Sequence, residues 1–418
     1  MNKTIGQVGE IWNDILQIWF GGYLDLVSGQ RRDQISPQSH LKKIKIILKD
    51  FFGSIIRLFI VKRIPKDKVW FFSISSNNYN ALSSIQKNVS DSIFVSRYSI
   101  KEGPNYETCF CDYRFRFFYL LFFPLNFFVY FFSYRSKAVS YYDLLFKTCG
   151  YYSESLRILK KYRPRAIVFT NDHEIAPRAL LLAAKKLNIT SYYVQHASVS
   201  KYFPPLKFDY ALLEGQDAKN KYLAIGKTNT KISLIGMPKL DKYVQWMNTK
   251  SKIESIGIAY NAMDNINLVK ELINQLTGTF PDLKFVIRPH PSDKRTLKIQ
   301  KVHLSNSRVE NSFEFLNRID ALIASDSSIH LEAVLLNVFS MSYNFNDNRF
   351  LDYYGFVQNN LINHYSGKTN LIKKINSLRS NKPHVQNKAK YYNAAIESDF
   401  YGSSSSKAAD IIIKTLNF

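Results

Sequence analysis

The chain has only three cysteines, Cys109, Cys111 and Cys149. An odd number without metal-ligand spacing supports neither a disulfide framework nor a zinc site. Such sparing use of cysteine is typical of a reducing compartment, so we expect a cytoplasmic protein. The first twenty residues agree with this expectation. Glu10 and Asp14 interrupt them, and they lack the basic segment and unbroken apolar run of a secretory signal.

Acidic residues are also few, with 33 Asp and Glu against 57 Lys and Arg and a net charge of +24. An excess of this size predicts an anionic partner, which can be nucleic acid, anionic lipid or a phosphorylated substrate. The aromatic residues gather in apolar clusters and do not alternate with basic residues, which argues against nucleic acid. Hydrophobic residues make up 46% of the 418 positions, enough to build folded cores.

No apolar run is long enough to be a clear transmembrane helix, but two segments suit a membrane surface. Leu41–Arg63, within a helical region 1–65, mixes apolar residues with many lysines, and a face that joins the protein core is an equal alternative. Arg114–Lys137 is an aromatic run broken by Pro124 and Asn126, with about 17 residues between its flanks. We expect it to enter the membrane interface, with a buried helical hairpin or a true span as alternatives. The protein would then associate peripherally with the inner face of the cell membrane.

Strand-like and helix-like segments alternate from Tyr151 onwards. Apolar runs such as "AIVFT", "SYYVQHA" and "KFVIRPHP" are each followed by a polar loop and then by a helical pattern. This alternation predicts βαβ units and parallel sheets, hence an α/β fold. We expect a Rossmann-like N-terminal domain at 66–240, with the aromatic segment 114–137 as an insert, and a second Rossmann-like domain at 253–418. The polar stretch Asp241–Lys252 would connect them. No period of about 20 to 50 residues recurs, which excludes a solenoid.

Two loops of the second domain carry residues suited to phosphate binding. "RPHPSD" follows one predicted strand, and its prolines end that strand. "SDSS" follows another and precedes a helix, where backbone N–H groups and hydroxyls attract phosphate. The simpler alternatives are a helix N-cap and a turn. The residues expected at a donor-nucleotide site are Arg288, His290, Ser325, Ser327, Ser328 and Glu332.

The series "NDHE", "QHASVSKYFPP", "LLEGQ", "IRPHPSD" and "SDSSIHLEAVLLNV" resembles bacterial capsule and lipopolysaccharide glycosyltransferases of GT-B architecture. This group includes polysialyltransferases, Kdo transferases and teichoic-acid glycerophosphotransferases, and the resemblance covers about half of the chain. It implies that His290, Ser327 and Ser328 hold the donor phosphates, that Glu332 holds the ribose, and that the donor carries a cytidine nucleotide. The Asp/Glu-Asp/Glu-Gly motif of bacterial sialyltransferases is absent, and the usual "QHG" is replaced by "QHA", with Ala197 in place of the glycine.

Glycosyl transfer to a hydroxyl needs a group that accepts the proton of the acceptor. Two strand-end clusters of the first domain offer one, Asp172-His173-Glu174 and Gln195-His196. We expect either Asp172 or His196 to be the catalytic residue. The resemblance favours His196, which matches a histidine near the acceptor in teichoic-acid-type enzymes. The alternatives are an N-cap for Asp172 and a backbone-bonded histidine for His196.

No Asp-x-Asp sequence stands in a clear strand-end context, so we expect neither a metal site nor a cofactor. The sequence therefore predicts a membrane-associated GT-B glycosyltransferase of bacterial capsule or lipopolysaccharide synthesis. It would use a nucleotide-sugar donor, with a CMP-linked sugar as the first expectation, and a glycan or lipid-linked acceptor. The alternatives are a polyol-phosphate transferase that uses CDP-glycerol or CDP-ribitol, and a non-catalytic binding protein that keeps the fold.

Overall fold

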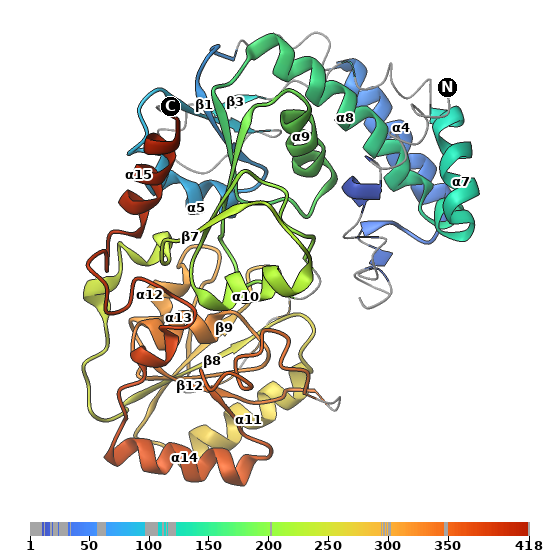
Figure 1. The fold of residues 1–418 in the computed structure, drawn as a ribbon. Helices are drawn as coiled ribbons and strands as arrows, with labels where there is room; N and C mark the ends of the chain where they lie inside the picture. Colours follow the sequence, from blue (N-terminus) through green and yellow to red (C-terminus); the bar gives the residue numbers. More distant parts are fainter. Residues whose placement is uncertain are drawn as a thin grey trace.

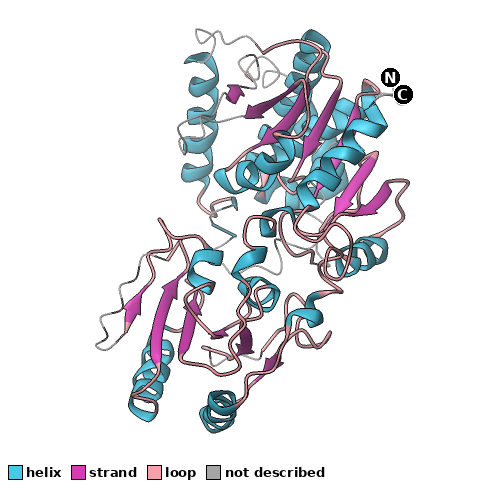
Figure 2. Ribbon diagram, turned by 90° about the vertical axis from the view of Figure 1, so that its left-hand side faces the viewer, coloured by secondary structure: helices cyan, strands magenta, loops and turns pink. Residues whose placement is uncertain are grey.

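A computed structural model gives the fold of the protein (Figure 1). It describes residues 35–56, 64–96, 108–110, 123–200, 203–293, 302–346 and 350–416, together with single residues at 11–33, 113, 115 and 295–299. Two parallel β-sheets form the centres of two domains, which lie one above the other in Figures 1 and 2.

The first sheet has seven strands in the described part of the chain, in the order β3-β2-β1-β4-β5-β6-β7. The strands are short apolar runs, as expected for parallel strands that are covered on both faces. Their bounds are β1 Val69–Ser73, β2 Ser92–Ser96, β3 Thr108–Phe110, β4 Ala166–Phe169, β5 Thr190–Val194, β6 Tyr210–Leu213 and β7 Lys231–Leu234.

Alternate residues of these strands enter two separate cores. Trp70, Phe72 and Phe169 pack on one face of the sheet with residues of α8 (Tyr142–Tyr162) and α9 (Ile175–Lys186). Phe71 and Val168 pack on the opposite face with residues of α5 (Ser76–Gln86). The helix α10 (Gln216–Ile225) follows β6. The two-residue period of the strands thus fixes which helices cover each face.

The second sheet has six strands in the described residues, ordered β10-β9-β8-β11-β12-β13. They are β8 Ser255–Tyr260, β9 Lys284–Pro289, β10 His303–Leu304, β11 Ala321–Ala324, β12 Phe339–Ser342 and β13 Asn363–His364. The helices of this domain are α11 Ile266–Thr279, α12 Ser312–Leu316, α13 Ile329–Leu335 and α14 Lys368–Ser380. Both sheets are parallel α/β sheets, which confirms the predicted fold class.

The chain crosses between the domains twice. The first crossing contains the 3-10 turns η3 (Pro238–Leu240) and η4 (Val244–Trp246). The second follows η5 (Gln386–Ala389) and leads to α15 (Ser404–Leu416), whose Ala408 and Ile412 lie in the core of the first domain. The last helix therefore packs on the first domain, although the expected second domain ran to the C-terminus.

Gly215 lies where the returning chain touches the first domain. A Cβ at this position would meet the backbone carbonyl of Tyr392 at 2.4 Å. Gly215→Ala should therefore lower the free energy of unfolding by about 1 to 3 kcal/mol, as overpacking does elsewhere. Urea denaturation measures this change. Gly278→Ala is the control, because no atom lies within 4 Å of its added methyl group and alanine favours the helix. Equal stability changes in the two variants would contradict the tight contact at Gly215.

The segments expected at the membrane form two helices, α4 (His40–Ile56) and α7 (Phe123–Ser140), which lie near each other beside α8 in Figure 1. The exposed apolar residues of α4 recur on one side of the helix: Leu41, Ile44, Leu48, Phe52 and Ile56. Phe128 and Phe132 of α7 are exposed, whereas Tyr130 is buried. None of the helices in the described ranges has the length and apolar character to cross a membrane. Most of 114–122 lies outside the described residues.

Candidate active site

The polar residues of interest follow strands of both sheets, on the carboxyl side of each strand. The order of the first sheet reverses between β1 and β4, and that of the second between β8 and β11. Parallel sheets of this kind bind ligands beside such reversals. Asp172 and His173 follow β4, and Ser325 to Ser328 follow β11. His196 follows β5, the neighbour of β4, and His290 follows β9, which is separated from β11 by β8.

Asp172 and His173 form a pair at the end of β4. The His173 Nδ1 atom lies 2.7 Å from Asp172 Oδ1, and the His173 ring packs on Phe203 with 4.0 Å between ring centroids. Asp172 is buried. Burial favours its neutral form, but His173 and Arg178 outweigh this effect and hold the pKa of the carboxyl below its ordinary value. Asp172 is thus suited to orient His173 and poorly suited to accept a proton itself.

Arg178 holds Asp172 in place from the first turn of α9. Its Nη1 donates to Asp172 Oδ2 at 2.8 Å, and its Nη2 donates to Asp14 Oδ1 at 2.9 Å. The Arg178 side chain is 1% exposed, so both carboxylates face a cation that has little contact with water. Lys207 adds a second cation to Asp14. This charge network ties residue 14 to the end of β4.

His196 lies beside this pair at the end of β5. Its Nε2 is 3.4 Å from Asn78 Nδ2, and its ring is largely shielded from solvent. Burial lowers the pKa of His196 to about 4, and the neighbouring His173 and Lys239 add to the effect. His196 is therefore neutral at pH 7, in an environment that opposes its protonation.

Glu214 follows β6 and is the next buried acid along this edge. Its backbone N–H donates to Gln195 Oε1 at 2.9 Å, and Gln195 Nε2 donates to Glu214 Oε2 at 3.4 Å. Burial raises the pKa of Glu214 to about 7, against the opposing charge of Lys239. A group with a pKa near neutrality can both give and take a proton at physiological pH.

Glu214 should make the stability of the protein depend on pH. Its pKa is higher in the folded state, so the folded state binds more protons between about pH 4.5 and pH 7. The contribution of Glu214 to the free energy of unfolding is largest below this range and is lost as pH rises through about 7. Glu214→Gln should therefore gain stability relative to the native chain between pH 5 and pH 8, by on the order of 3 kcal/mol. Urea denaturation at both pH values measures the gain. The exposed Glu254→Gln is the control, and parallel profiles for the native chain and Glu214→Gln would refute the assignment.

His290 presents one nitrogen to solvent at the end of β9. The backbone N–H of Ser292 donates to His290 Nδ1 at 3.2 Å, and Ser292 Oγ lies 2.7 Å from the same atom. Because Nδ1 accepts a hydrogen bond, we assign the ring proton of the neutral form to Nε2. Burial lowers the pKa of His290. Its exposed Nε2–H can donate to an oxygen of a ligand.

Hydrogen bonds of the buried His330 side chain support the loop Ser325 to Ser328. The His330 Nε2 lies 2.7 Å from the Ser325 carbonyl, and its Nδ1 lies 2.7 Å from Ser340 Oγ. Burial lowers the pKa of His330 to about 4, so the ring is a neutral support. Ser325 is buried and bonds to Asp264, whereas Ser328 is exposed at the start of α13. The free hydroxyl of this loop is therefore that of Ser328, with Ser327 half-buried beside it.

Glu332 connects the second domain to the first crossing. Its Oε1 lies 2.6 Å from Lys239 Nζ, which belongs to η3. Burial opposes the charge of Lys239, but Glu332 and Glu214 outweigh it and raise the pKa of the ammonium. Lys239 thus stands between an acid that follows β6 and an acid in α13. This contact links Lys239, which follows the last strand of the first sheet, to Glu332 in the helix that follows β11 of the second sheet.

Arg288 has a different environment from the one expected for a donor ligand. Its guanidinium is buried, donates to Ser305 Oγ at 2.7 Å and to the Glu310 carbonyl at 2.9 Å, and lies over Phe315. These contacts give Arg288 a structural role in the second domain, so the proposed donor site does not include it. Among the described residues, no group of three His, Cys, Asp or Glu side chains could hold a metal ion.

Three residues of this region are not predicted from the sequence. His173 enters there only as a neighbour of Asp172, Glu214 belongs to a motif that is incomplete, and Lys239 lies in the stretch "KISLIGMPKLD" but is given no role. A signal for Glu214 exists, because an acid directly after an apolar strand lies at the binding edge of a parallel sheet. Lys239 has no such signal, since its partner is 93 residues away.

The comparisons with known proteins agree with this fold. No protein-family model matches the sequence, and no curated protein matches it. Among solved structures, the UDP-GlcNAc 2-epimerase from Neisseria meningitidis bound to UDP-GlcNAc has a TM-score of 0.53 and 13% identity, over 83% of this chain and 100% of that chain. The wall teichoic acid polymerase TagF, soaked with CDPG, has a TM-score of 0.53 and 14% identity, over 91% and 98%.

These likenesses define the class of fold. The chain has the GT-B architecture, in which two Rossmann-like domains face a cleft, as the sequence predicted. At 13 to 14% identity the likeness concerns the fold alone.

Proposed function

We propose that the protein is a glycosyltransferase of bacterial surface-polysaccharide synthesis, which transfers a sugar from a nucleotide-activated donor to a glycan or lipid-linked acceptor. The observation that carries this proposal is the contact of Lys239 with Glu332 and its proximity to Glu214. Lys239 is thus a cation beside Glu214 of one domain and Glu332 of the other, which supports the proposal. A lysine in such a position can stabilise the negative charge of a leaving nucleotide.

The donor would bind at the edge of the second sheet. The His290 Nε2–H and the Ser327 and Ser328 hydroxyls supply hydrogen-bond donors for the phosphates. Glu332 is the carboxylate for the ribose hydroxyls, and Lys239, which it holds, balances the charge of the leaving nucleotide. CMP-linked sugars are the donors we would test first.

The acceptor would react at the edge of the first sheet. Nε2 of His173 accepts the proton of the acceptor hydroxyl while the oxygen attacks the anomeric carbon, and the bond from that carbon to the donor phosphate breaks. The nucleotide leaves with the bonding electron pair. Asp172 lies 2.7 Å from Nδ1 of His173, an ion-pair contact that would keep the ring in place and leave Nε2 for the acceptor. His196 is the neutral neighbour that bounds the site.

A second candidate is transfer of a polyol phosphate, in which the acceptor oxygen attacks phosphorus and not carbon. The likeness to the wall teichoic acid polymerase TagF supports it, because that match extends over 91% of this chain, whereas the match to the epimerase extends over 83%. The same donor residues would serve both reactions, with a CDP-linked polyol in place of the sugar nucleotide.

The exposed apolar side of α4 supports the proposed position at a membrane. Its apolar residues lie beside Lys42, Lys45 and Lys49, all exposed, so the helix can bury apolar groups in a bilayer while its lysines meet anionic headgroups. Lipid-linked acceptors would be reached from such a position.

A thermal-shift panel with CMP, CDP, UDP, GDP and glucose tests the donor site. A nucleotide present at 100 times its dissociation constant should stabilise the protein by about 2.7 kcal/mol. We expect a cytidine nucleotide to raise Tm, and we expect His290→Ala to abolish the rise. His384→Ala, an exposed histidine of the same domain, should leave it unchanged. If no nucleotide raises Tm, the proposal of a nucleotide-dependent transferase fails.

A further inference from the structure

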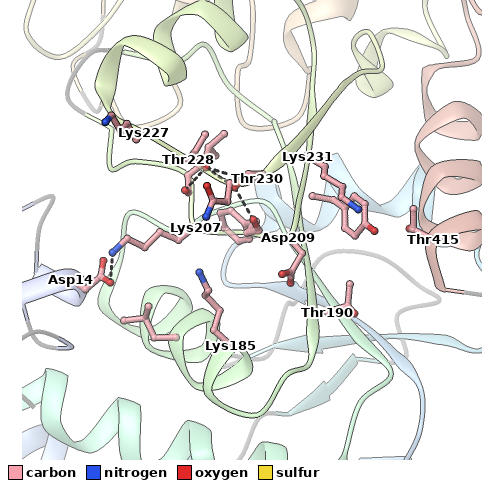
Figure 3. Close-up of a pocket in the computed structure, with 15 residues that line it drawn as sticks. Asp14, Lys185, Thr190, Lys207, Asp209, Lys227, Thr228, Thr230, Lys231 and Thr415 are labelled. Atoms are coloured by element: carbon pink, nitrogen blue, oxygen red, sulfur yellow. Dashed lines mark hydrogen bonds and ion pairs between the residues drawn. The ribbon is translucent and has the colours of Figure 1, made fainter. Parts of the chain in front are cut away.

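A cavity lies at the opposite ends of the strands from the candidate active site. Its volume is about 760 Å³, and it is lined by Thr190 at the start of β5, Asp209 just before β6 and Lys231 at the start of β7 (Figure 3). His196 follows the other end of β5, so the sheet separates the two places by roughly 20 Å at the rise of a β-strand. A ligand in this cavity cannot be the donor in the cleft.

The cavity carries an excess of positive charge. Among the described residues that line it, four are lysines, Lys185, Lys207, Lys227 and Lys231, and two are acids, Asp14 and Asp209. Asp14 is paired with Lys207 and Arg178. Asp209 Oδ2 accepts from the backbone N–H of Ser191 at 2.8 Å and from its hydroxyl at 2.7 Å, so it is occupied in holding β5.

Three ammonium groups are therefore left around one cavity. Within the described part of the chain, Lys185, Lys227 and Lys231 form no ion pair. Like charges gathered around a concave surface repel each other and raise the local concentration of anions. An anionic ligand would relieve that repulsion.

The loop that carries two of these lysines is fixed by hydrogen bonds. Thr228 Oγ1 donates to the Leu206 carbonyl at 2.8 Å, and Thr230 Oγ1 donates to the Phe208 carbonyl at 2.7 Å. The Thr230 N–H also donates to Thr228 Oγ1 at 3.1 Å. Lys227 and Lys231 flank these threonines, and Lys231 Nζ lies over the Tyr210 ring. A fixed loop thus carries two of the lysines that line the cavity.

We propose that this cavity binds a phosphate-bearing saccharide or polyol, at a site separate from the donor site. The cations that line the cavity are lysines, and a lysine ammonium binds phosphate as a point charge. The volume lies within the range of small-molecule sites and exceeds the need of a single phosphate ion. The inference does not depend on which transfer reaction the cleft performs.

The test is the broadening of the ³¹P resonance of glycerol 3-phosphate by the full-length protein. The triple variant Lys185→Gln, Lys227→Gln, Lys231→Gln should bind about tenfold more weakly than the native chain. The matched control is Lys186→Gln, Lys242→Gln, Lys373→Gln, which removes the same charge from positions outside the cavity. His290→Ala should retain the broadening, because its site is in the other domain.

Three outcomes would overturn the proposal. Unchanged broadening in the first triple variant would show that these lysines do not bind the phosphate. An equal loss in the control triple variant would assign the effect to net charge, and a loss in His290→Ala would assign it to the donor site. Failure of the nucleotide panel leaves this test unaffected, so the two proposals can fail separately. Thermal unfolding of each variant confirms that the comparison is made on folded protein.

Discussion

His173→Asn should lower kcat by about 10² to 10⁴, the usual contribution of a general base. Asparagine keeps the approximate shape of the side chain but cannot accept the proton of the acceptor hydroxyl. The donor residues lie in the other domain, so the KM for the donor should change little. Steady-state release of nucleotide measures both constants, with a donor that carries the nucleotide identified by the thermal-shift panel.

The same assay on His196→Asn separates the two histidines of the first domain. His196 is held in a buried environment that opposes its protonation, and we expect a smaller fall in kcat than for His173→Asn. If His196→Asn loses more activity than His173→Asn, then His196 is the general base and His173 its neighbour. Nucleotide binding in the thermal-shift assay must persist in both variants, because the proposed change affects proton transfer alone.

Arg178→Met should lower the free energy of unfolding by about 3 to 5 kcal/mol. The substitution leaves the Asp172 carboxylate buried without its principal cation, and removal of one partner of a buried ion pair carries a cost of this size. Asp14 loses one of its two cations but keeps Lys207. Urea denaturation at pH 7 measures the change.

The surface pair of Arg379 and Asp282 provides the control for this prediction. Both side chains are substantially exposed, so Arg379→Met should cost about 0 to 1 kcal/mol. The double variant Arg178→Met, Asp172→Asn should regain part of the lost stability, because the uncompensated charge is gone. A loss in Arg178→Met no larger than that in Arg379→Met would mean that the buried network contributes little to stability.

The sheets could be predicted because their signals are local. "VWFFS", "AIVF" and "ALIA" are short apolar runs bounded by polar loops, and each became a buried strand. The same reasoning placed Asp172, His196, His290 and Ser328 beside strand ends. Neighbouring residues in the sequence are enough to establish such positions.

Contacts between distant segments could not be predicted in this way. Glu332 and Lys239 meet across 93 residues, and Asp14 and Arg178 across 164 residues. The direction of a side chain was equally out of reach. Arg288 and His290 stand two residues apart, yet the first is buried among Ser305 and Glu310 and the second is exposed. Tertiary packing determines whether a side chain points into the core or to solvent, and a short sequence motif carries no information about that packing.

The return of the chain to the first domain limits how the cleft can open. Gly236 lies in the first crossing, and a Cβ there would touch Ser404 at the end of the second crossing. The two connections therefore pass side by side, and Asp241 accepts hydrogen bonds from the backbone of Ser404 and Ser405 across them. Separation of the two domains would have to stretch both connections and break the hydrogen bonds between them, so two joined connections oppose separation more strongly than a single linker would.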